Sequence, residues 1–497
     1  MIRNEEKIHR TPDVKTKRFR ISAFAPLYGD VEDDSVGFGY TKYACNVNIS
    51  DGRIVRSAGV AQAKVNDHLF PSTFSVGTAV ADGTIFKRYD YSTGNWDHRV
   101  VYLDSDGDVY EARIGTSSAL TQLNVSRSVF KKFLHYHYNN KDALLLFDAE
   151  LGKIELYDGT TIVSGNTPKL TDACVYNDKV YGVENVGYNR LRFSATNDPF
   201  DWTTSESGAG SVYFSDEGGV LRRVVPCGEN LYVFRDYAVY KLTAYKGVKD
   251  YTLTKIFSAA EKICPQTVAC WSNQVFFLAE KGLYAIEGNN VKSVWRAEFS
   301  MIKDPSHATA VCHNGAYYLA AKFVTDGGTV GEEAQCTYNN GIMVMMIGSG
   351  GNVELVRGVD VKRFVPCDID GKGYMFLVNG NGYRCLHMSM LTDDGKIYGT
   401  NAEKRWRSPE KLLTHLGEDV TIRKVHVQSA SNITVKVIVD GRTHEFAVTG
   451  STKTSSFAVN DRGERLQIVL TGTADHFSPR GFEVEYETTE RRQYGAN

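Results

Sequence analysis

Few groups of residues in this sequence have the types and spacing that catalysis requires. The chain contains no G-x-S-x-G, H-E-x-x-H or G-x-x-x-x-G-K-[S/T] pattern, so the sequence gives no sign of a hydrolase elbow, a zinc-protease helix or a phosphate-binding loop. The glycine-rich stretch 348–351 lies between two predicted strands with no helix after it, which indicates a hairpin turn. We therefore predict no enzyme activity, no catalytic residue and no cofactor.

Two groups of residues have the types that bind metals. Asp104, Asp106 and Asp108 are spaced like part of a calcium loop, but the glycine falls at the fourth position and no helices flank it. A hairpin turn rich in Asp and Gly explains the run better. His135 and His137 share one face of a predicted strand, but no third ligand can be identified. The sequence therefore predicts no metal site.

The nine cysteines are spread from Cys45 to Cys385 and form no C-x-x-C pair. This spacing favours reduced thiols that pack as small hydrophobic residues in a reducing compartment. A metal or redox role for single cysteines this far apart is the alternative, and it cannot be judged from spacing.

Length and composition bound the class of protein. The chain has 497 residues, of which 42% are hydrophobic and 23% charged, values that exclude a disordered chain and a membrane-spanning one. The net charge of -2, from 57 basic and 59 acidic residues, argues against a dedicated nucleic-acid binder. It does not exclude a protein that DNA merely passes. The N-terminus has no apolar segment typical of a signal peptide, and we expect no membrane insertion.

Alternation of apolar and polar residues dominates from about residue 20 onward and predicts an all-β protein. Residues 98–114 and 143–159 are predicted hairpins, each with two β-rich runs around a short polar turn. The only predicted helix covers residues 408–417, with Ser408 as N-cap and Pro409 at the first helical position.

Five segments of the chain repeat one pattern: a cysteine, a tight polar turn, an aromatic strand, a second turn and another strand. Their cysteines are Cys174, Cys227, Cys270, Cys312 and Cys367, at intervals of 53, 43, 42 and 55 residues. Two more degenerate units precede them. Propeller blades of four strands recur at about 40–50 residues, so we predict a six- or seven-bladed β-propeller.

Beyond about residue 418 the strands become short and alternate cleanly, which is typical of a small β-sandwich. The predicted organisation is an N-terminal arm (1–25), the propeller (26–410), the sandwich (411–490) and a tail (491–497).

The N-terminal arm is basic and the segment after it is acidic. Residues 1–20 carry a net charge of +4, and four of the five residues 30–34 are acidic. A solvated tail explains this pattern, and so does an arm that docks on the acidic segment of a neighbouring subunit in a ring. The candidate interface residues are Arg3, Lys7, Arg10, Lys15, Lys17, Arg18, Asp30, Glu32, Asp33 and Asp34.

Several segments together resemble one family of viral structural proteins. Residues 189–203, NRLRFSATNDPFDWT, are similar to an R-x-S-x-x-x-D-P-x-x-W segment of tail proteins from short-tailed bacteriophages. Residues 40–61, 218–244 and 462–487 resemble the opening segment, a middle blade and the sandwich end of the same proteins, in the same order. The chain therefore resembles the tail nozzle, or tail hub, family. The motif residues in this sequence are Phe193, Ser194, Asn197, Asp198, Pro199 and Trp202.

Turn chemistry accounts for that motif without a functional role. Residues 197–199, Asn-Asp-Pro, favour turn initiation, and Phe193 and Trp202 are expected to be buried anchors beside the turn. An ordinary blade corner explains these residues fully, so we assign them no active role.

The resemblance implies a structural protein of the virion. Nozzle proteins form hexameric rings, attach to the tail adaptor and portal, carry fibres or spikes, and surround the DNA during ejection. Such a protein is assembled in the host cytoplasm. A channel wall of nearly neutral charge avoids the phosphate contacts that make DNA binding tight.

Two other readings remain open. One is a glycan-binding or glycan-cleaving propeller, although the Ser-x-Asp-x-Gly-x-x-Trp turns typical of sialidases are absent. Exposed aromatic residues beside two or more close carboxylates would favour this reading. The other is a propeller scaffold outside any virus, because scaffolds leave no chemical signature.

Overall fold

The computed structural model is all-β and divides into two compact units. It describes residues 15–27, 32–70, 80–116, 119–129, 131–184, 189–244, 251–279, 282–295, 301–324, 336–348, 353–380, 388–414 and 418–490. One unit comprises residues 59–350 and 356–400, and the other comprises residues 1–58, 351–355 and 401–497. Among the described residues, no helix has the length and hydropathy of a membrane-spanning segment.

The first unit is a β-propeller. In its described part, six antiparallel sheets of four consecutive strands follow one another along the chain. We number these sheets as blades 1 to 6. Blade 1 contains β8 (Val80–Asp90), β9 (Asn95–Asp104), β10 (Val109–Arg113) and β11 (Thr121–Leu123); blade 2 contains β12 (Lys131–Tyr138), β13 (Lys141–Asp148), β14 (Lys153–Tyr157) and β15 (Ile162–Asn166); and blade 3 contains β16 (Leu170–Tyr176), β17 (Lys179–Glu184), β18 (Arg190–Phe193) and β19 (Gly210–Tyr213). Blade 4 contains β20 (Leu221–Cys227), β21 (Asn230–Arg235), β22 (Ala238–Ala244) and β23 (Tyr251–Ser258); blade 5 contains β24 (Ile263–Trp271), β25 (Gln274–Ala279), β26 (Gly282–Glu287) and β27 (Asn290–Trp295); and blade 6 contains β28 (Ile302–His313), β29 (Ala316–Phe323), β30 (Gly341–Met346) and β31 (Val353–Arg357).

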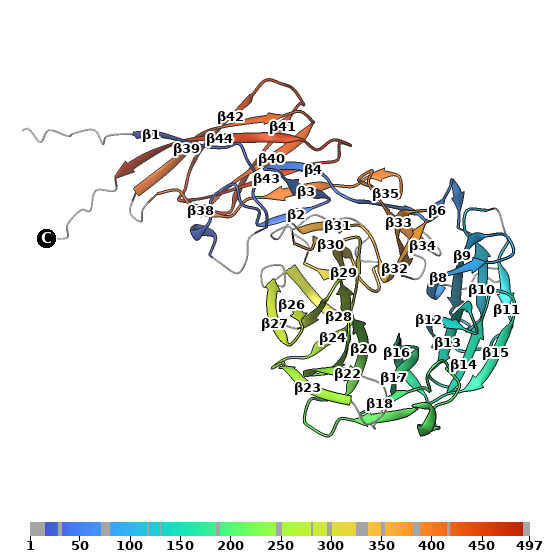
Figure 1. The fold of residues 1–497 in the computed structure, drawn as a ribbon. Helices are drawn as coiled ribbons and strands as arrows, with labels where there is room; N and C mark the ends of the chain where they lie inside the picture. Colours follow the sequence, from blue (N-terminus) through green and yellow to red (C-terminus); the bar gives the residue numbers. More distant parts are fainter. Residues whose placement is uncertain are drawn as a thin grey trace, which may run out of the picture. The chain divides into compact units, whose positions relative to one another are not determined.

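A seventh sheet closes the ring. Blade 7 contains β32 (Val361–Ile369), β33 (Lys372–Asn379) and β34 (Met388–Thr392), and its next strand is β5 (Gly59–Gln62), which comes from before blade 1. The first strand of each blade contacts the first strand of the next, and β32 contacts β8. The blades therefore form a closed circle around a common centre (Figure 1).

Consecutive blades pack face to face, which is why their strands can be apolar on both sides. The second strand of blade 2 illustrates this packing. Leu144 and Leu146 lie in a buried cluster with Phe86 of blade 1. Leu145 and Phe147 point the other way and lie in a cluster with residues of blade 3. Because successive side chains of a strand alternate between faces, one run of apolar residues fills two interfaces.

The second unit is a β-sandwich. One sheet has the order β1-β44-β39-β42 and the other β2-β37-β43-β40-β41, with β38 pairing β43. The strands are β1 (Lys15–Ile21), β2 (Tyr43–Cys45), β37 (Lys404–Arg407), β38 (Lys411–Leu412), β39 (Glu418–Ser429), β40 (Ile433–Val439), β41 (Arg442–Val448), β42 (Ser455–Arg462), β43 (Arg465–Gly472) and β44 (Pro479–Glu490). Shorter elements complete the chain: β3 (Val47–Ser50), β4 (Arg53–Arg56), β6 (Lys64–Val65), β7 (His68–Leu69), β35 (Lys396–Ile397), β36 (Thr400–Asn401) and the 3-10 turns η1 (Asp33–Ser35) and η2 (Ser205–Ser207).

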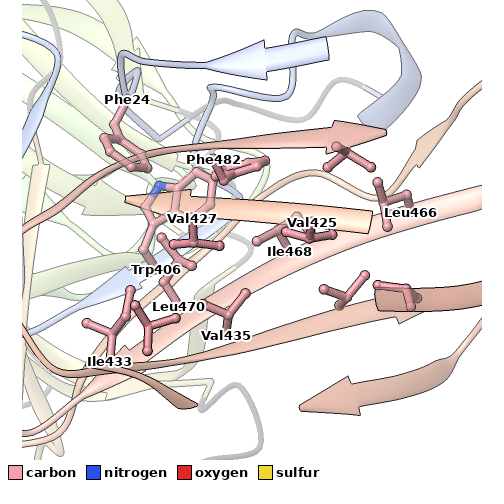
Figure 2. Close-up of a cluster of buried hydrophobic side chains, with 14 of the residues drawn as sticks. Phe24, Trp406, Val425, Val427, Ile433, Val435, Leu466, Ile468, Leu470 and Phe482 are labelled. Atoms are coloured by element: carbon pink, nitrogen blue, oxygen red, sulfur yellow. The ribbon is translucent and has the colours of Figure 1, made fainter. Parts of the chain in front are cut away.

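The sandwich core gathers residues from both ends of the chain (Figure 2). Trp406 is fully buried, and its ring meets that of Phe24 edge to face with centroids 5.0 Å apart. Its indole Nε1 donates a hydrogen bond to Thr41 Oγ1 at 2.8 Å. Valine, isoleucine and leucine side chains of β39, β40 and β43 form much of the remaining core, together with Phe482, Val484 and Tyr486 of β44. The described residues between Lys15 and Ala58 are therefore part of this domain and not a separate arm.

The all-β class and the propeller-plus-sandwich architecture are confirmed, but the predicted domain boundaries are wrong. The propeller starts at residue 59 rather than 26, and the sandwich resumes at residue 401 rather than 411. The cause is that the sandwich is discontinuous in sequence: its N-terminal strands precede the propeller and its other strands follow it. The predicted tail, residues 491–497, lies outside the described residues.

The predicted helix at residues 408–417 is also wrong over its described part, residues 408–414. Lys411 and Leu412 form strand β38, which pairs with β43. The buried Ser408 hydroxyl accepts a hydrogen bond from Ile468 N at 2.9 Å instead of capping a helix. Pairing with a neighbouring strand therefore overrides a local cap signal of modest strength.

Candidate functional site

Charged side chains gather on the first, innermost strands of the propeller. Asp82, Lys132, Asp172, Arg223 and Arg363 belong to blades 1, 2, 3, 4 and 7, respectively. We call these five residues the collar. Each lies near the start of its strand, so the chain places them at equivalent positions around the ring.

Register shifts position four of the five collar side chains. In β8, β16, β20 and β32, the pairing with the second strand slips immediately before the collar residue. The slips fall at Val80/Asp82, Leu170/Asp172, Leu221/Arg223 and Val361/Arg363. An extra residue in one strand of an antiparallel pair bends that strand and changes the direction of the side chain beside it.

The collar residues make polar contacts from one blade to the next. Lys132 Nζ lies 2.8 Å from Asp172 Oδ1, joining blades 2 and 3. The Arg363 guanidinium is paired with Asp82, joining blades 7 and 1. Arg223 Nη1 donates to Gln266 Oε1 at 3.1 Å, joining blades 4 and 5. The second oxygen of Asp172 accepts from Val224 N at 3.0 Å, which adds a contact to blade 4.

The charges of the collar also act on one another across the ring. Burial lowers the pKa of Lys132, while the carboxylate of Asp172 opposes that shift. The positive charges of Arg223 and Arg363 lower the pKa of Lys132 further, although they belong to blades 4 and 7. Burial likewise lowers the pKa of Arg223. Cations from three blades therefore share one polar centre, where paired carboxylates offset their repulsion.

The segment that carries the family resemblance forms a tight corner after β18. Ser194 is buried, and its hydroxyl accepts from Val180 N at 3.0 Å and donates to Ala195 O at 2.9 Å. Asn197 has a left-handed backbone with φ of 60°, a conformation that asparagine tolerates better than most residues. Asp198 Oδ1 accepts a hydrogen bond from Phe200 N at 2.9 Å, which closes the turn that contains Pro199.

Both predicted anchors of this corner are buried, as expected. Phe193 is fully buried and Trp202 is 4% exposed. Trp202 Nε1 donates to Pro199 O at 2.9 Å, and its ring packs in a cluster with Tyr136 and Leu145 of blade 2. The motif therefore locks blade 3 against blade 2, and its polar atoms are used within the corner.

The predicted basic residues fall in two places. Arg3, Lys7 and Arg10 lie outside the described residues. Lys15, Lys17 and Arg18 do not form an extended arm: they belong to strand β1, which pairs with β44 of the same chain. Arg18 Nη2 lies 2.7 Å from Glu485 Oε2. Alternation of Arg18, Phe19 and Arg20 provides the reason, because Phe19 packs against the sandwich core while its neighbours face outward.

The acidic segment bonds elsewhere within the sandwich unit. Asp30 lies outside the described residues, and Glu32 precedes the turn η1. Asp33 Oδ1 lies 2.8 Å from Lys42 Nζ. Asp34 accepts from Leu412 N at 2.7 Å and pairs with Arg465 Nη2 at 3.0 Å. Asp34 thus binds the backbone of β38, and Asp33 and Asp34 pair with Lys42 and Arg465.

The cysteines depart from the expectation that all are reduced. A disulfide joins Cys227 of blade 4 to Cys270 of blade 5. The reason is geometric: each lies near the end of its blade's first strand, and their Cα atoms are 5.9 Å apart. Cys312 and Cys367 occupy the corresponding strands of later blades as thiols, and burial raises the pKa of each to about 12. Those two thiols are therefore unreactive near neutral pH.

The two groups of residues of metal-binding type make ordinary contacts within the chain. Asp104 Oδ1 accepts from the backbone N of Asp106 at 3.0 Å and of Asp108 at 2.8 Å, which is a hairpin turn. His137 lies 3.4 Å from Asp142, and His135 has a pKa lowered by burial. Within the described ranges, no cluster of three or more His, Cys, Asp or Glu side chains is arranged to hold a metal ion.

Sequence reasoning missed the collar, although a signal for it was present. Four collar residues stand two positions after an apolar residue that opens the first strand of a blade. The four triplets are 80–82 (VAD), 170–172 (LTD), 221–223 (LRR) and 361–363 (VKR). Each triplet alone is an ordinary strand start, and only alignment of the blades reveals the shared charged position.

Sheet order and the closed circle of first strands define a β-propeller protein with a discontinuous sandwich. No protein-family model matches the chain, and no curated protein matches it. Among solved structures, it is similar to BBS1N, crystallised in complex with ARL6DN, with a TM-score of 0.44, 12% identity, and coverage of 63% of this chain and 94% of that one.

Two bacterial proteins are also similar in structure, with lower TM-scores. The extracellular domain of BT4673 from B. thetaiotaomicron has a TM-score of 0.43 and 10% identity, covering 92% of this chain and 64% of that one. PorZ of Porphyromonas gingivalis has a TM-score of 0.30 and 11% identity, covering 74% and 46%. The chain thus spans less than two thirds of the length of these two proteins.

Proposed function

We propose that this chain is a structural subunit of a bacteriophage tail, a nozzle or hub protein that assembles into a hexameric ring. In this role it attaches to the tail adaptor and portal, carries fibres or spikes, and surrounds the genome during ejection. The phage assignment is supported by the ordered resemblance of residues 40–61, 189–203, 218–244 and 462–487 to tail proteins.

The observation that carries a structural role is how the collar uses its charges. Its ion pairs join blade 2 to blade 3 and blade 7 to blade 1, so these groups stabilise the ring of blades. Loss of one partner would leave the other, partly buried charge unpaired, so these ion pairs favour the closed arrangement of the blades. Charged side chains of several blades interact at that centre. We therefore infer that DNA passes between copies of the chain and not through the middle of one propeller.

The test is the assembly state of the full-length chain. Mass photometry and negative-stain electron microscopy of the purified protein should find rings or subunits that join a ring, and an antibody against the chain should label the tails of phage particles. A monodisperse monomer that hydrolyses glycans would overturn the proposal in favour of a glycan-cleaving propeller. A ring found only in uninfected bacteria would favour a non-viral scaffold.

A further inference from the structure

The hairpin that opens blade 1 has longer strands than the hairpin of blade 2 and carries exposed aromatic rings at its tip. Strands β8 and β9 have 11 and 10 residues, whereas the corresponding strands of blade 2 have 8 each. The last two pairs of the ladder are Tyr89 with Trp96 and Asp90 with Asn95. Tyr91 is 71% exposed and Trp96 is 51% exposed.

The rings of this tip are held by one another. Tyr89 meets Tyr91 edge to face with centroids 5.0 Å apart, and meets Trp96 in the same way at 5.4 Å. Lys87 Nζ lies 4.6 Å from the centre of the Trp96 ring. We call Tyr89, Tyr91 and Trp96 the aromatic tip. Because each ring is fixed by a neighbour, the tip presents apolar surface with little loss of side-chain freedom on binding.

A polar cleft of about 230 Å³ lies beside the tip. Its walls include Lys87 of blade 1, His135, His137 and Asp142 of blade 2, and Asp178 of blade 3.

The aromatic tip and the cleft are joined by a direct contact. Tyr89 N donates to Asp142 Oδ2 at 2.9 Å, which ties the hairpin to the cleft wall. Lys87 contributes to both features, since it lines the cleft and lies over Trp96. Aromatic surface and convergent polar groups therefore form one continuous site.

The chemistry of the site selects one class of ligand. Two carboxylates, one ammonium and two imidazoles line the cleft, so hydroxyl groups of a ligand find both acceptors and donors there. The opposing charges leave little net field for an anion, and the carboxylates repel phosphates, which argues against nucleic acid. Apolar CH faces can stack on the aromatic tip while hydroxyls enter the cleft. Uncharged sugars have both features, because their rings present apolar CH faces and carry hydroxyl groups.

We propose that the aromatic tip and this cleft form a binding site for an uncharged oligosaccharide. The cleft is smaller than the roughly 300–1,000 Å³ typical of pockets that enclose a ligand, so it holds part of the chain while further sugars lie on the tip. This site requires no hydrolysis and does not depend on the ring. It gives the propeller a means of contacting a polysaccharide surface.

The test uses the full-length protein on an array of uncharged and acidic bacterial polysaccharides and oligosaccharides. We expect binding to one or more uncharged glycans, weakened about tenfold or more by Trp96→Ala or Asp142→Asn. The matched control is Tyr213→Ala, which removes an aromatic side chain 60% exposed on blade 3 and should leave binding unchanged. Circular dichroism and melting temperature verify that each variant is folded.

Three outcomes would overturn the inference: no binding to any uncharged glycan, equal binding by the Trp96→Ala variant, or binding restricted to acidic glycans. Mass photometry of the same variants identifies a fourth outcome, in which the aromatic tip binds protein rather than glycan. If Trp96→Ala abolishes ring assembly while no glycan binds, the aromatic tip is a protein contact and the inference is wrong. Failure of the wild-type chain to form rings, with glycan binding intact, would count against the proposed function alone.

Discussion

The Lys132–Asp172 ion pair offers a quantitative test of the collar. Asp172→Asn removes the negative charge while its amide oxygen can still accept from Val224 N. Breaking a buried ion pair on one side costs about 3–5 kcal/mol. The Lys132 side chain is 26% exposed, and solvent reduces the cost to about 2–3 kcal/mol. A propeller of this size unfolds with an entropy of about 0.7 kcal/mol/K, so the melting temperature should fall by about 3–4 °C.

The assay is thermal unfolding with hydrogen exchange of peptides from blades 2 and 3. Hydrogen exchange is needed because a chain of two units does not unfold in one step. Lys132→Met/Asp172→Asn removes both charges and should recover most of the loss, since no buried ammonium remains unpaired. The matched control is Glu445→Gln, which breaks the exposed pair with Lys436 and should cost less than about 0.5 kcal/mol.

The pH dependence provides a second readout of the same variant. Burial already lowers the pKa of Lys132 below its ordinary 10.5, and loss of the Asp172 charge removes the main opposing influence. Between the lowered pKa and 10.5, the unfolded chain binds more protons than the folded one, so stability rises with pH. The deficit of Asp172→Asn should therefore shrink as the pH is raised. A variant as stable as wild type, or a double variant as unstable as the single one, would refute the role of the collar.

Three further results are expected. Trp202→Ala should cost about 3–5 kcal/mol by emptying the corner between blades 2 and 3, whereas Trp202→Phe should cost less because its smaller ring still fills part of the corner, although the bond to Pro199 O is lost; calorimetry distinguishes them. Reduction of Cys227–Cys270, which closes a span of 43 residues, should lower stability by up to about 4 kcal/mol, and Cys227→Ala/Cys270→Ala should melt alike with and without reductant. Burial lowers the pKa of His98 below 6.5, so stability should fall as the pH drops below that value; His98→Gln should flatten a plot of melting temperature against pH, and an unchanged slope would contradict this cause.

Local signals predicted the strands and blades well, because each hairpin is specified by its own alternation and turn residues. Residues 98–104 and 109–113 illustrate this, since they pair as β9 and β10 around the turn that starts at Asp104. The corner at residues 197–202 could also be predicted, because Asn, Asp and Pro each favour a particular turn geometry.

Features that depend on distant parts of the chain were not predictable in the same way. The pairing of β5 with β34 closes the ring across more than 300 residues, and no local pattern marks it. The collar and the cleft combine side chains from different blades, so their partners become visible only once the blades are arranged. The prediction of a helix at residues 408–417 was wrong for the same reason, because the backbone N of the distant Ile468 donates to the Ser408 hydroxyl that was expected to cap the helix.

The closure of blade 7 by β5 has a consequence for the order of folding during synthesis. Strand β5 lies between β34 and β35, which is near the end of the propeller in the sequence. The propeller is thus an insertion into the sandwich, and the sandwich strands before residue 58 emerge long before those after residue 401. At roughly 5–20 residues per second, the ribosome needs about 17–70 s to translate the sequence between them. During that interval Phe24 lacks Trp406, its principal partner. The N-terminal strands must therefore stay accessible until the last strands are made.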